Sequence, residues 1–132
     1  MNPPFNIPWG SSIWARVEAI NVLGQSGFSA AGNGAVILSV PGAPTDLQNV
    51  AAKTTGFRIG LSWIPPVSDG GAPVLDYRVF SDLGLGNGVY EIVDSNILQL
   101  NYIVEALKPG VIYSFKVAAR NIYGYGIQSS PV

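Results

Sequence analysis

The sequence predicts an all-β fold, an antiparallel β-sandwich made of short strands. Apolar and polar residues alternate in several short segments, and this two-residue period is typical of half-buried strands. The 16 glycines and 10 prolines indicate frequent turns between these segments. No stretch has the apolar period of an α-helix.

The central part of the chain contains the clearest strand. Around Leu61 and Trp63 the alternation is regular, and it stops at residues 65–66, because two prolines cannot continue a strand ladder. Tyr77 and Val79 repeat the pattern in the next segment. Strands are expected at 44–50, 57–63, 75–79, 89–94, 99–106 and 113–119, and the glycine-rich stretch 84–88 is expected to be a hairpin loop.

One motif occurs twice in the chain, at a separation of one hundred residues. Residues 10–30 match residues 110–130 without a gap, and both segments alternate as strands do. The identical pairs are Gly10 and Gly110, Val17 and Val117, Ala19 and Ala119, Asn21 and Asn121, Gly24 and Gly124, and Ser29 and Ser129. A period of about one hundred residues suits sandwich domains in tandem. We therefore expect the closing strands of a preceding module in residues 1–40 and a main module in residues 41–132.

Several motifs of the main module keep a characteristic order and spacing. They are Pro41-x-x-Pro44-x-x-Leu47, Leu61-x-Trp63-x-x-Pro66, Gly70-Gly71-x-Pro73, Tyr77-x-Val79 and Leu107-x-Pro109-Gly110-x-x-Tyr113-x-Phe115-x-Val117-x-Ala119-x-Asn121-x-x-Gly124. In this order they resemble a fibronectin type III module. The resemblance implies an immunoglobulin-like antiparallel β-sandwich, with Trp63 in the core and Tyr113 as a corner tyrosine whose hydroxyl bonds to upstream backbone. The expected core residues are Leu61, Trp63, Tyr77, Val79, Leu107, Tyr113, Phe115 and Val117.

The two copies differ in ways that concern their completeness. Ile13 stands where the second copy has the corner tyrosine, and Val132 aligns with Gly32. Because nothing then matches the apolar run 35–40, the main module is expected to lack most of its last strand. Two strands cannot bury their own apolar face. Either the sequence is part of a longer tandem array, or copies exchange strands and assemble head-to-tail into a filament.

The composition argues against catalysis and against several classes of partner. Cysteine and histidine are absent, which removes thiol and imidazole chemistry and their metal sites, so we expect no enzyme activity and no cofactor. Asp69 falls in a glycine-rich turn and Asp82 at the end of a strand, and solvated turn acids are common in both places. A net charge of −1 indicates no nucleic-acid partner. No apolar run approaches the ~20 residues that cross a bilayer.

Apolar side chains in the first copy indicate a contact surface. Trp14 and Ile20 fall on outward positions, and the apolar run 35–40 contains Val36, Ile37 and Leu38. We expect these five residues at an interface with a neighbouring module or with another copy of the same protein.

The resemblance and the composition together favour a non-catalytic structural or protein-interaction module of a repetitive extracellular or cell-surface protein. Charged residues make up only 11% of the chain, well below the roughly 25% usual in soluble domains, which favours contact with neighbours. Two alternatives remain at this point. One is a spacer module of a secreted carbohydrate-active enzyme, and the other is an intracellular cytoskeletal or ciliary tandem array.

Overall fold

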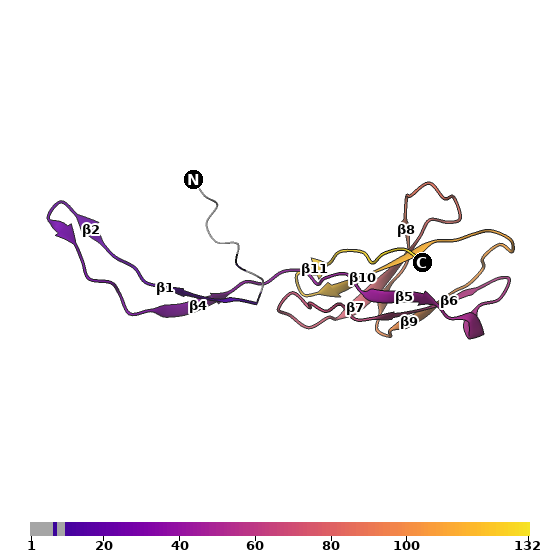
Figure 1. The fold of residues 1–132 in the computed structure, drawn as a ribbon, viewed down its shortest axis with the longest axis horizontal. Helices are drawn as coiled ribbons and strands as arrows, with labels where there is room; N and C mark the ends of the chain where they lie inside the picture. The colour runs from indigo at the N-terminus through magenta and orange to yellow at the C-terminus, as the bar shows by residue number, and fades with distance from the viewer. Residues whose placement is uncertain (1–6, 8–9) are drawn as a thin grey trace. The chain divides into compact units, whose positions relative to one another are not determined.

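The computed structural model describes residue 7 and residues 10–132, and the chain divides into two compact units. The first unit ends at Leu38 and the second begins at Ser39. The closing strands of a preceding module are expected in residues 1–40, and residues 1–6, 8 and 9 of this range lie outside the described part of the chain. Figure 1 shows strands in both units, and the only helical turn among the described residues is a 3₁₀ turn, η1 (Ala51–Lys53).

The second unit is a sandwich of two antiparallel sheets. The three-stranded sheet has the order β5-β6-β9 and consists of β5 (Thr45–Asn49), β6 (Ile59–Ile64) and β9 (Asn101–Val104). The four-stranded sheet has the order β11-β10-β7-β8 and consists of β7 (Asp76–Ser81), β8 (Glu91–Ile97), β10 (Phe115–Asn121) and β11 (Gly124–Tyr125). The predicted all-β antiparallel sandwich is confirmed.

The core lies between the two sheets and is made by alternate residues of their strands. β6 contributes Leu61 and Trp63, which are 0% and 4% exposed, and β7 contributes Tyr77 and Val79. The ring centroids of Trp63 and Tyr77 lie 5.6 Å apart. A large aromatic side chain buries on the order of 150–250 Å², so this pair is a major part of the packing between the sheets.

The other predicted core residues lie at two depths. Phe115 and Val117 of β10 are fully buried, whereas Leu107 and Tyr113 are partly buried and pack against the core cluster. The hydroxyl of Tyr113 accepts a hydrogen bond of 3.0 Å from the backbone N–H of Lys108. This is the bond to upstream backbone that the family resemblance implies for a corner tyrosine.

The end of the second unit runs along β10. After β11, backbone hydrogen bonds join Gly126 to Ala119, Ser129 to Val117 and Val132 to Phe115. Backbone pairing with β10 therefore begins at β11 and continues to Val132, although only Gly124–Tyr125 form a regular strand. The expectation that the main module lacks most of its last strand stays a prediction.

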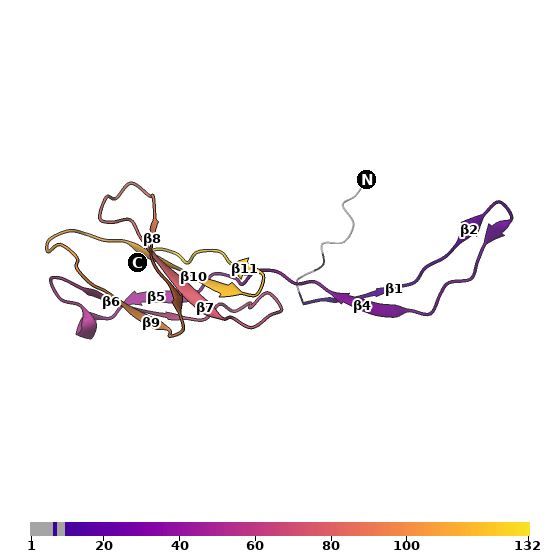
Figure 2. The same ribbon diagram turned by 180° about the vertical axis from the view of Figure 1, so that it is seen from behind.

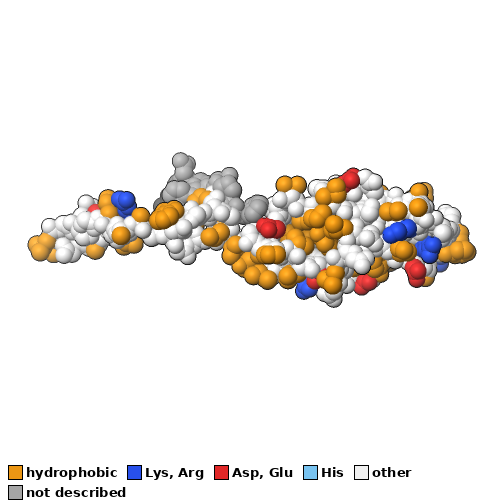
Figure 3. Space-filling view, turned by 90° about the horizontal axis from the view of Figure 1, so that it is seen from below, with side chains coloured by type: hydrophobic (Ala, Val, Ile, Leu, Met, Phe, Trp, Pro, Cys, Tyr) orange, Lys and Arg blue, Asp and Glu red, His pale blue; other side chains and the backbone are white. Residues whose placement is uncertain are grey.

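The first unit is a β-hairpin (Figures 1 and 2). β1 (Ser12–Ala15) pairs with β4 (Gly32–Val36), and β2 (Ile20–Asn21) pairs with β3 (Gly24–Gln25) nearer the turn. Figure 3 shows apolar side chains on the surface of this hairpin. Val17 is 70% exposed, whereas its counterpart Val117 in the sandwich is 0% exposed.

The hairpin and the end of the sandwich share the same local hydrogen bonds, one hundred residues apart. Ser29 bonds to Val17 through its backbone N–H and its Oγ, at 2.9 Å each. Their counterparts in the second unit make the same two bonds at 2.8 and 3.0 Å. The turn residues Asn21 and Asn121 each accept a bond of 2.8 Å from the backbone N–H two residues later. The sequence repeat is therefore also a repeat of local structure.

Candidate interaction site

The outer face of the four-stranded sheet carries charged and aromatic side chains. Successive residues of a strand point to opposite sides of the sheet. Arg78 lies between the core residues Tyr77 and Val79 of β7, so it faces outward. Lys116 and Arg120 alternate with core residues of β10 and face outward for the same reason.

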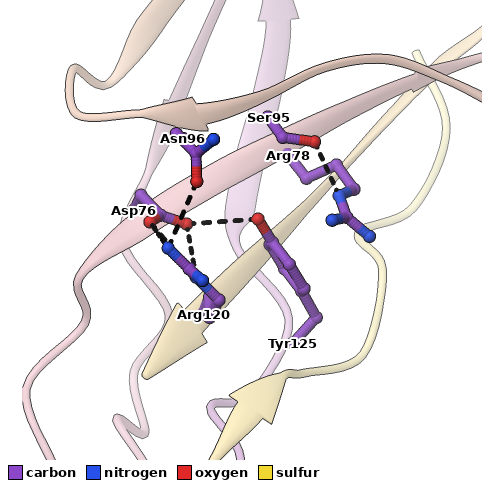
Figure 4. Close-up of polar contacts among 6 residues, drawn as sticks. All are labelled: Asp76, Arg78, Ser95, Asn96, Arg120 and Tyr125. Carbon is purple, nitrogen blue, oxygen red and sulfur yellow. Dashed lines mark hydrogen bonds and ion pairs between the residues drawn. The ribbon is translucent and has the colours of Figure 1, made fainter. Parts of the chain in front are cut away.

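Arg120 is bound to the carboxylate of Asp76 (Figure 4). Nε of Arg120 donates to the two carboxylate oxygens at 3.0 and 3.1 Å, and Nη2 forms an ion pair with Oδ2. Nη2 also donates to Oδ1 of Asn96 at 3.2 Å, and the hydroxyl of Tyr125 donates to Asp76 at 3.3 Å. The hydrogen bond to Asp76 raises the pKa of Arg120. The nearly buried Asp76 thus has the charged partner that a carboxylate out of water requires.

Arg78 is held by contacts of a different kind. Its Nε donates to Oγ of Ser95 at 2.9 Å, and its Cζ lies 3.8 Å from the centroid of the Tyr125 ring (Figure 4). The Cζ of Arg120 lies 5.4 Å from the same centroid. One aromatic ring therefore holds two guanidinium groups within the range of a cation–π contact.

Lys116 forms a second pair of a cation with an aromatic ring. Its Nζ lies 4.2 Å from the ring centroid of Tyr90. The hydroxyl of Tyr90 is hydrogen-bonded to Oγ of Ser114 at 2.9 Å, which holds the ring in place. Two tyrosines thus position the two cations, Arg78 and Lys116, on this face.

Asp82 is buried, which corrects the prediction that it is a solvated turn acid. It is 6% exposed, and its carboxylate accepts hydrogen bonds from the backbone N–H groups of Gly84 and Ser114 at 2.9 Å and of Gly86 at 3.3 Å. Burial raises the pKa of Asp82, but the backbone hydrogen bonds together outweigh burial and lower the pKa below its ordinary value. The loop 82–88 is therefore organised around this carboxylate.

A hydrogen bond joins the edge strands of the two sheets. The hydroxyl of Tyr102 in β9 donates to Oδ2 of Asp94 in β8 at 2.8 Å. Burial, this hydrogen bond and the charges of Asp94 and Glu105 raise the pKa of Tyr102 to about 12. The hydroxyl therefore keeps its proton, and can donate this bond, throughout the neutral range.

The five predicted interface residues all belong to the first unit. Trp14, Ile20, Val36 and Leu38 are 65%, 70%, 51% and 42% exposed, and Ile37 is half-buried. Exposed apolar side chains on a two-stranded hairpin suit a surface that another chain segment covers. A contact role for these residues stays a prediction.

The segment 39–42 is anchored to the turn between β10 and β11 by Asn121. This side chain is 1% exposed, and its Nδ2 donates to the backbone carbonyl oxygens of Ser39 and Asp69 at 2.8 Å each. Its Oδ1 accepts the bond from Tyr123 within the turn. These two carbonyl partners lie 82 and 52 residues away in the sequence, so the residues around Asn121 do not reveal the bonds.

Gly126 allows the same segment to approach the turn closely. A Cβ at this position would lie 1.9 Å from the backbone oxygen of Pro41. The matching residue of the first copy is Ser26. We expect the substitution Gly126→Ser to displace residues 39–42 and to lower the free energy of unfolding by about 1–3 kcal/mol, the usual cost of overpacking.

Hydrogen exchange measures this displacement. The backbone N–H groups of Ser39 and Gly42 donate to the carbonyl oxygens of Gly70 and Ser68 at 2.8 Å each, and both should exchange faster in Gly126→Ser. Gly56→Ser is the matched control, since a Cβ there meets no atom within 4 Å. Unchanged protection of the two N–H groups in Gly126→Ser would contradict the anchoring role.

The two stacked antiparallel sheets define a module of the β-sandwich class. Within residue 7 and residues 10–132, no group of three His, Cys, Asp or Glu residues could hold a metal, and no helix is long and apolar enough to cross a membrane. The sequence profile of the fibronectin type III domain matches residues 42–132, and the chain belongs to this family. The resemblance seen in the motifs is thereby confirmed.

Relatives of the chain include muscle proteins and receptors. M-protein from striated muscle of Gallus gallus is 29% identical over 117 residues, which is 88% of this chain. The netrin receptor DCC of Homo sapiens is 34% identical over 96 residues, which is 72% of this chain. The chain spans only 8% and 6% of the lengths of these two proteins. The solved structure of domains A168-A170 from titin matches 95% of this chain and 40% of its own chain, with a TM-score of 0.67 and 22% identity, which shows a common fold.

Proposed function

We propose that this chain is part of a tandem array, in which residues 10–38 form the last two strands of one module and residues 42–132 form the next. The role of such modules is spacing and contact with neighbouring modules rather than catalysis. The observation that carries this proposal is the repetition of the hairpin, with the same hydrogen bonds, after one hundred residues.

The difference in burial between the two hairpins supports the proposal. Val117 packs against the opposite sheet of its own module, whereas Val17 has no such sheet among the described residues and is exposed. A preceding module would supply that sheet. The alignment with M-protein, at 117 residues, is longer than the range 42–132 and so extends into the segment before it. The relatives include muscle proteins and receptors, and the tandem array is proposed without a choice between the inside of the cell and its surface.

A duplicated chain tests the proposal directly. Residues 41–109 are placed before residue 10 of the full chain, so that the hairpin 10–38 follows the strands that it would complete. We expect the backbone N–H of Ser29, which already bonds to Val17, to exchange at least tenfold more slowly in the duplicated chain than in the 132-residue chain. When Val17→Asp is introduced into the duplicated chain, the N–H of Ser29 should lose this added protection, whereas the N–H of Ser129 should stay protected.

A second version of the duplicated chain removes the main differences between the copies. It carries Ile13→Tyr and Ser26→Gly, which restore the corner tyrosine and the close approach at the turn. If Ser29 exchanges as fast in both versions as in the 132-residue chain, the proposal of a tandem array is wrong. The competing assembly is a filament that grows by strand exchange. It predicts that the apparent mass of the 132-residue chain in light scattering increases with concentration, whereas the array proposal predicts the mass of a monomer.

A further inference from the structure

Two cations on the outer face of the four-stranded sheet have no carboxylate partner. Among the described residues the ion pair of Arg120 with Asp76 is the only one. Arg78 uses its Nε for Ser95, and its two terminal nitrogens make no hydrogen bond within residues 10–132. The ammonium group of Lys116 lies over the ring of Tyr90 and forms no ion pair within residues 10–132. Both cations can therefore still bind an anion.

Aromatic contacts hold these cations in place before any ligand arrives. The guanidinium of Arg78 is stacked on Tyr125 at 3.8 Å, and Lys116 lies over Tyr90 at 4.2 Å. A long basic side chain normally loses rotamer freedom when it binds, and a side chain that is already positioned loses less. Arg78 in addition presents a planar fork that matches a carboxylate.

The acidic residues of the neighbouring strand are directed away from this face. Glu91 of β8 lines a cavity of about 330 Å³ between β8 and β9, together with Glu105. Asp94 of β8 is bonded to Tyr102 of β9. The carboxylate of Asp76 is occupied by Arg120 and Tyr125. The outer face is therefore positive, although the whole chain has a net charge of −1.

The strand register sets the distance between the two cations. Arg78 pairs with Ala118 and Phe80 pairs with Lys116, so the two cations are diagonal neighbours on one face. Diagonal neighbours lie about 7–8 Å apart. In an extended peptide, side chains two positions apart point the same way and are separated by about 6.6 Å. Phe80 and Ala118, which pair with Lys116 and Arg78, share this face and are buried.

From this charge and spacing we propose that the outer face of β7 and β10 binds an extended acidic segment of a partner protein, with carboxylates two positions apart. One carboxylate pairs with the fork of Arg78 and the other with the ammonium of Lys116. The proposal needs only the folded second unit, so it stands or fails independently of the tandem array.

A nuclear magnetic resonance titration of the 132-residue chain tests the proposal. The probe is a peptide of glycine and serine in which a single Glu-Ser-Glu supplies the only charged side chains. The comparison peptide carries the same two glutamates next to each other. At low salt we expect shifts concentrated on the amides of β7 and β10, and tighter binding of Glu-Ser-Glu. Arg78→Gln and Lys116→Gln should each weaken binding by roughly five- to tenfold, the effect of losing one charge-assisted contact.

Cation variants elsewhere serve as controls. Arg58→Gln and Lys53→Gln remove the same charge from other parts of the module and should leave the dissociation constant within about twofold. If Arg78→Gln changes the whole spectrum, and so disturbs the fold, Arg78→Lys is used in its place. The lysine keeps the positive charge and lacks only the planar fork of the guanidinium. Equal effects of all four glutamine variants would reduce the binding to general charge attraction and overturn the proposal. It would also be overturned if inorganic phosphate reproduced the shifts at the same concentration as the peptide.

Discussion

Replacing Trp63 with alanine is expected to lower the free energy of unfolding by about 3–5 kcal/mol, the usual cost of removing a large buried aromatic side chain. Trp63 is 4% exposed and packs against Tyr77 between the two sheets. Domains of this size are stable by about 5–15 kcal/mol, so the variant should be close to unfolding at room temperature. Urea denaturation followed by circular dichroism measures the change.

Trp14 offers a matched control for the same chemical change. It is 65% exposed, so Trp14→Ala should alter the stability of the sandwich by no more than about 0.5 kcal/mol. Trp63→Phe is a milder test, because Nε1 of Trp63 is buried without a hydrogen-bond partner in the described structure and no bond is lost with it. A stability loss from Trp14→Ala as large as that from Trp63→Ala would contradict the assignment of the core.

Replacing Asp82 with alanine is the second change with a large expected effect, a loss of about 2–4 kcal/mol. The backbone N–H groups of Gly84, Gly86 and Ser114 would lose their charged acceptor, and hydrogen bonds to a charged group contribute more to stability than neutral ones. Asp69→Ala is the control, because Asp69 is an exposed turn acid with one such bond, to the N–H of Gly71. We expect it to cost less than about 1 kcal/mol. Equal losses from the two substitutions, measured by urea denaturation, would contradict a special role for Asp82.

The lowered pKa of Asp82 also predicts a dependence on pH. The ionised carboxylate is favoured in the folded state, so its contribution is fully present above the ordinary value of 3.8 and is lost as the pH falls through the lowered folded-state pKa. The difference in unfolding free energy between the wild type and Asp82→Asn should therefore be constant near neutral pH and shrink in acid. A difference that did not change with pH would show that the charge is not the stabilising feature.

The strands and the core could be read from the sequence because alternate burial is a local property. A residue such as Leu61 or Val79 belongs to the core by its place in an alternating segment, and the structure buries both completely. The boundaries were less accurate: the strand expected at 89–94 is β8, Glu91–Ile97, and the one expected at 99–106 is β9, Asn101–Val104. Loop backbone and register shifts between paired strands set such ends, and the alternation does not encode them.

The surface cluster around Arg78 could have been found only in part. Its outward position follows from the alternation around Tyr77 and Val79, and the basic residues 116 and 120 fall on outward positions of the strand that contains Val117 and Ala119. The stacking on Tyr125 was not visible, because Tyr125 reaches Arg78 across β10. The aromatic partner of this cation comes from a strand that is not adjacent to β7, and strand order is a property of the whole fold.

By itself the sequence determined the β-sandwich, the family and the repetition of the hairpin, since each depends on residue types at short, regular spacings. Only the tertiary structure decided the roles of Asp82 and Asn121. Asp82 is stabilised by the N–H of Ser114, 32 residues later, and Asn121 binds the carbonyl oxygen of Ser39, 82 residues earlier. A polar side chain in a turn has the same local sequence whether water or distant backbone satisfies it, and folding alone brings that backbone within hydrogen-bond distance.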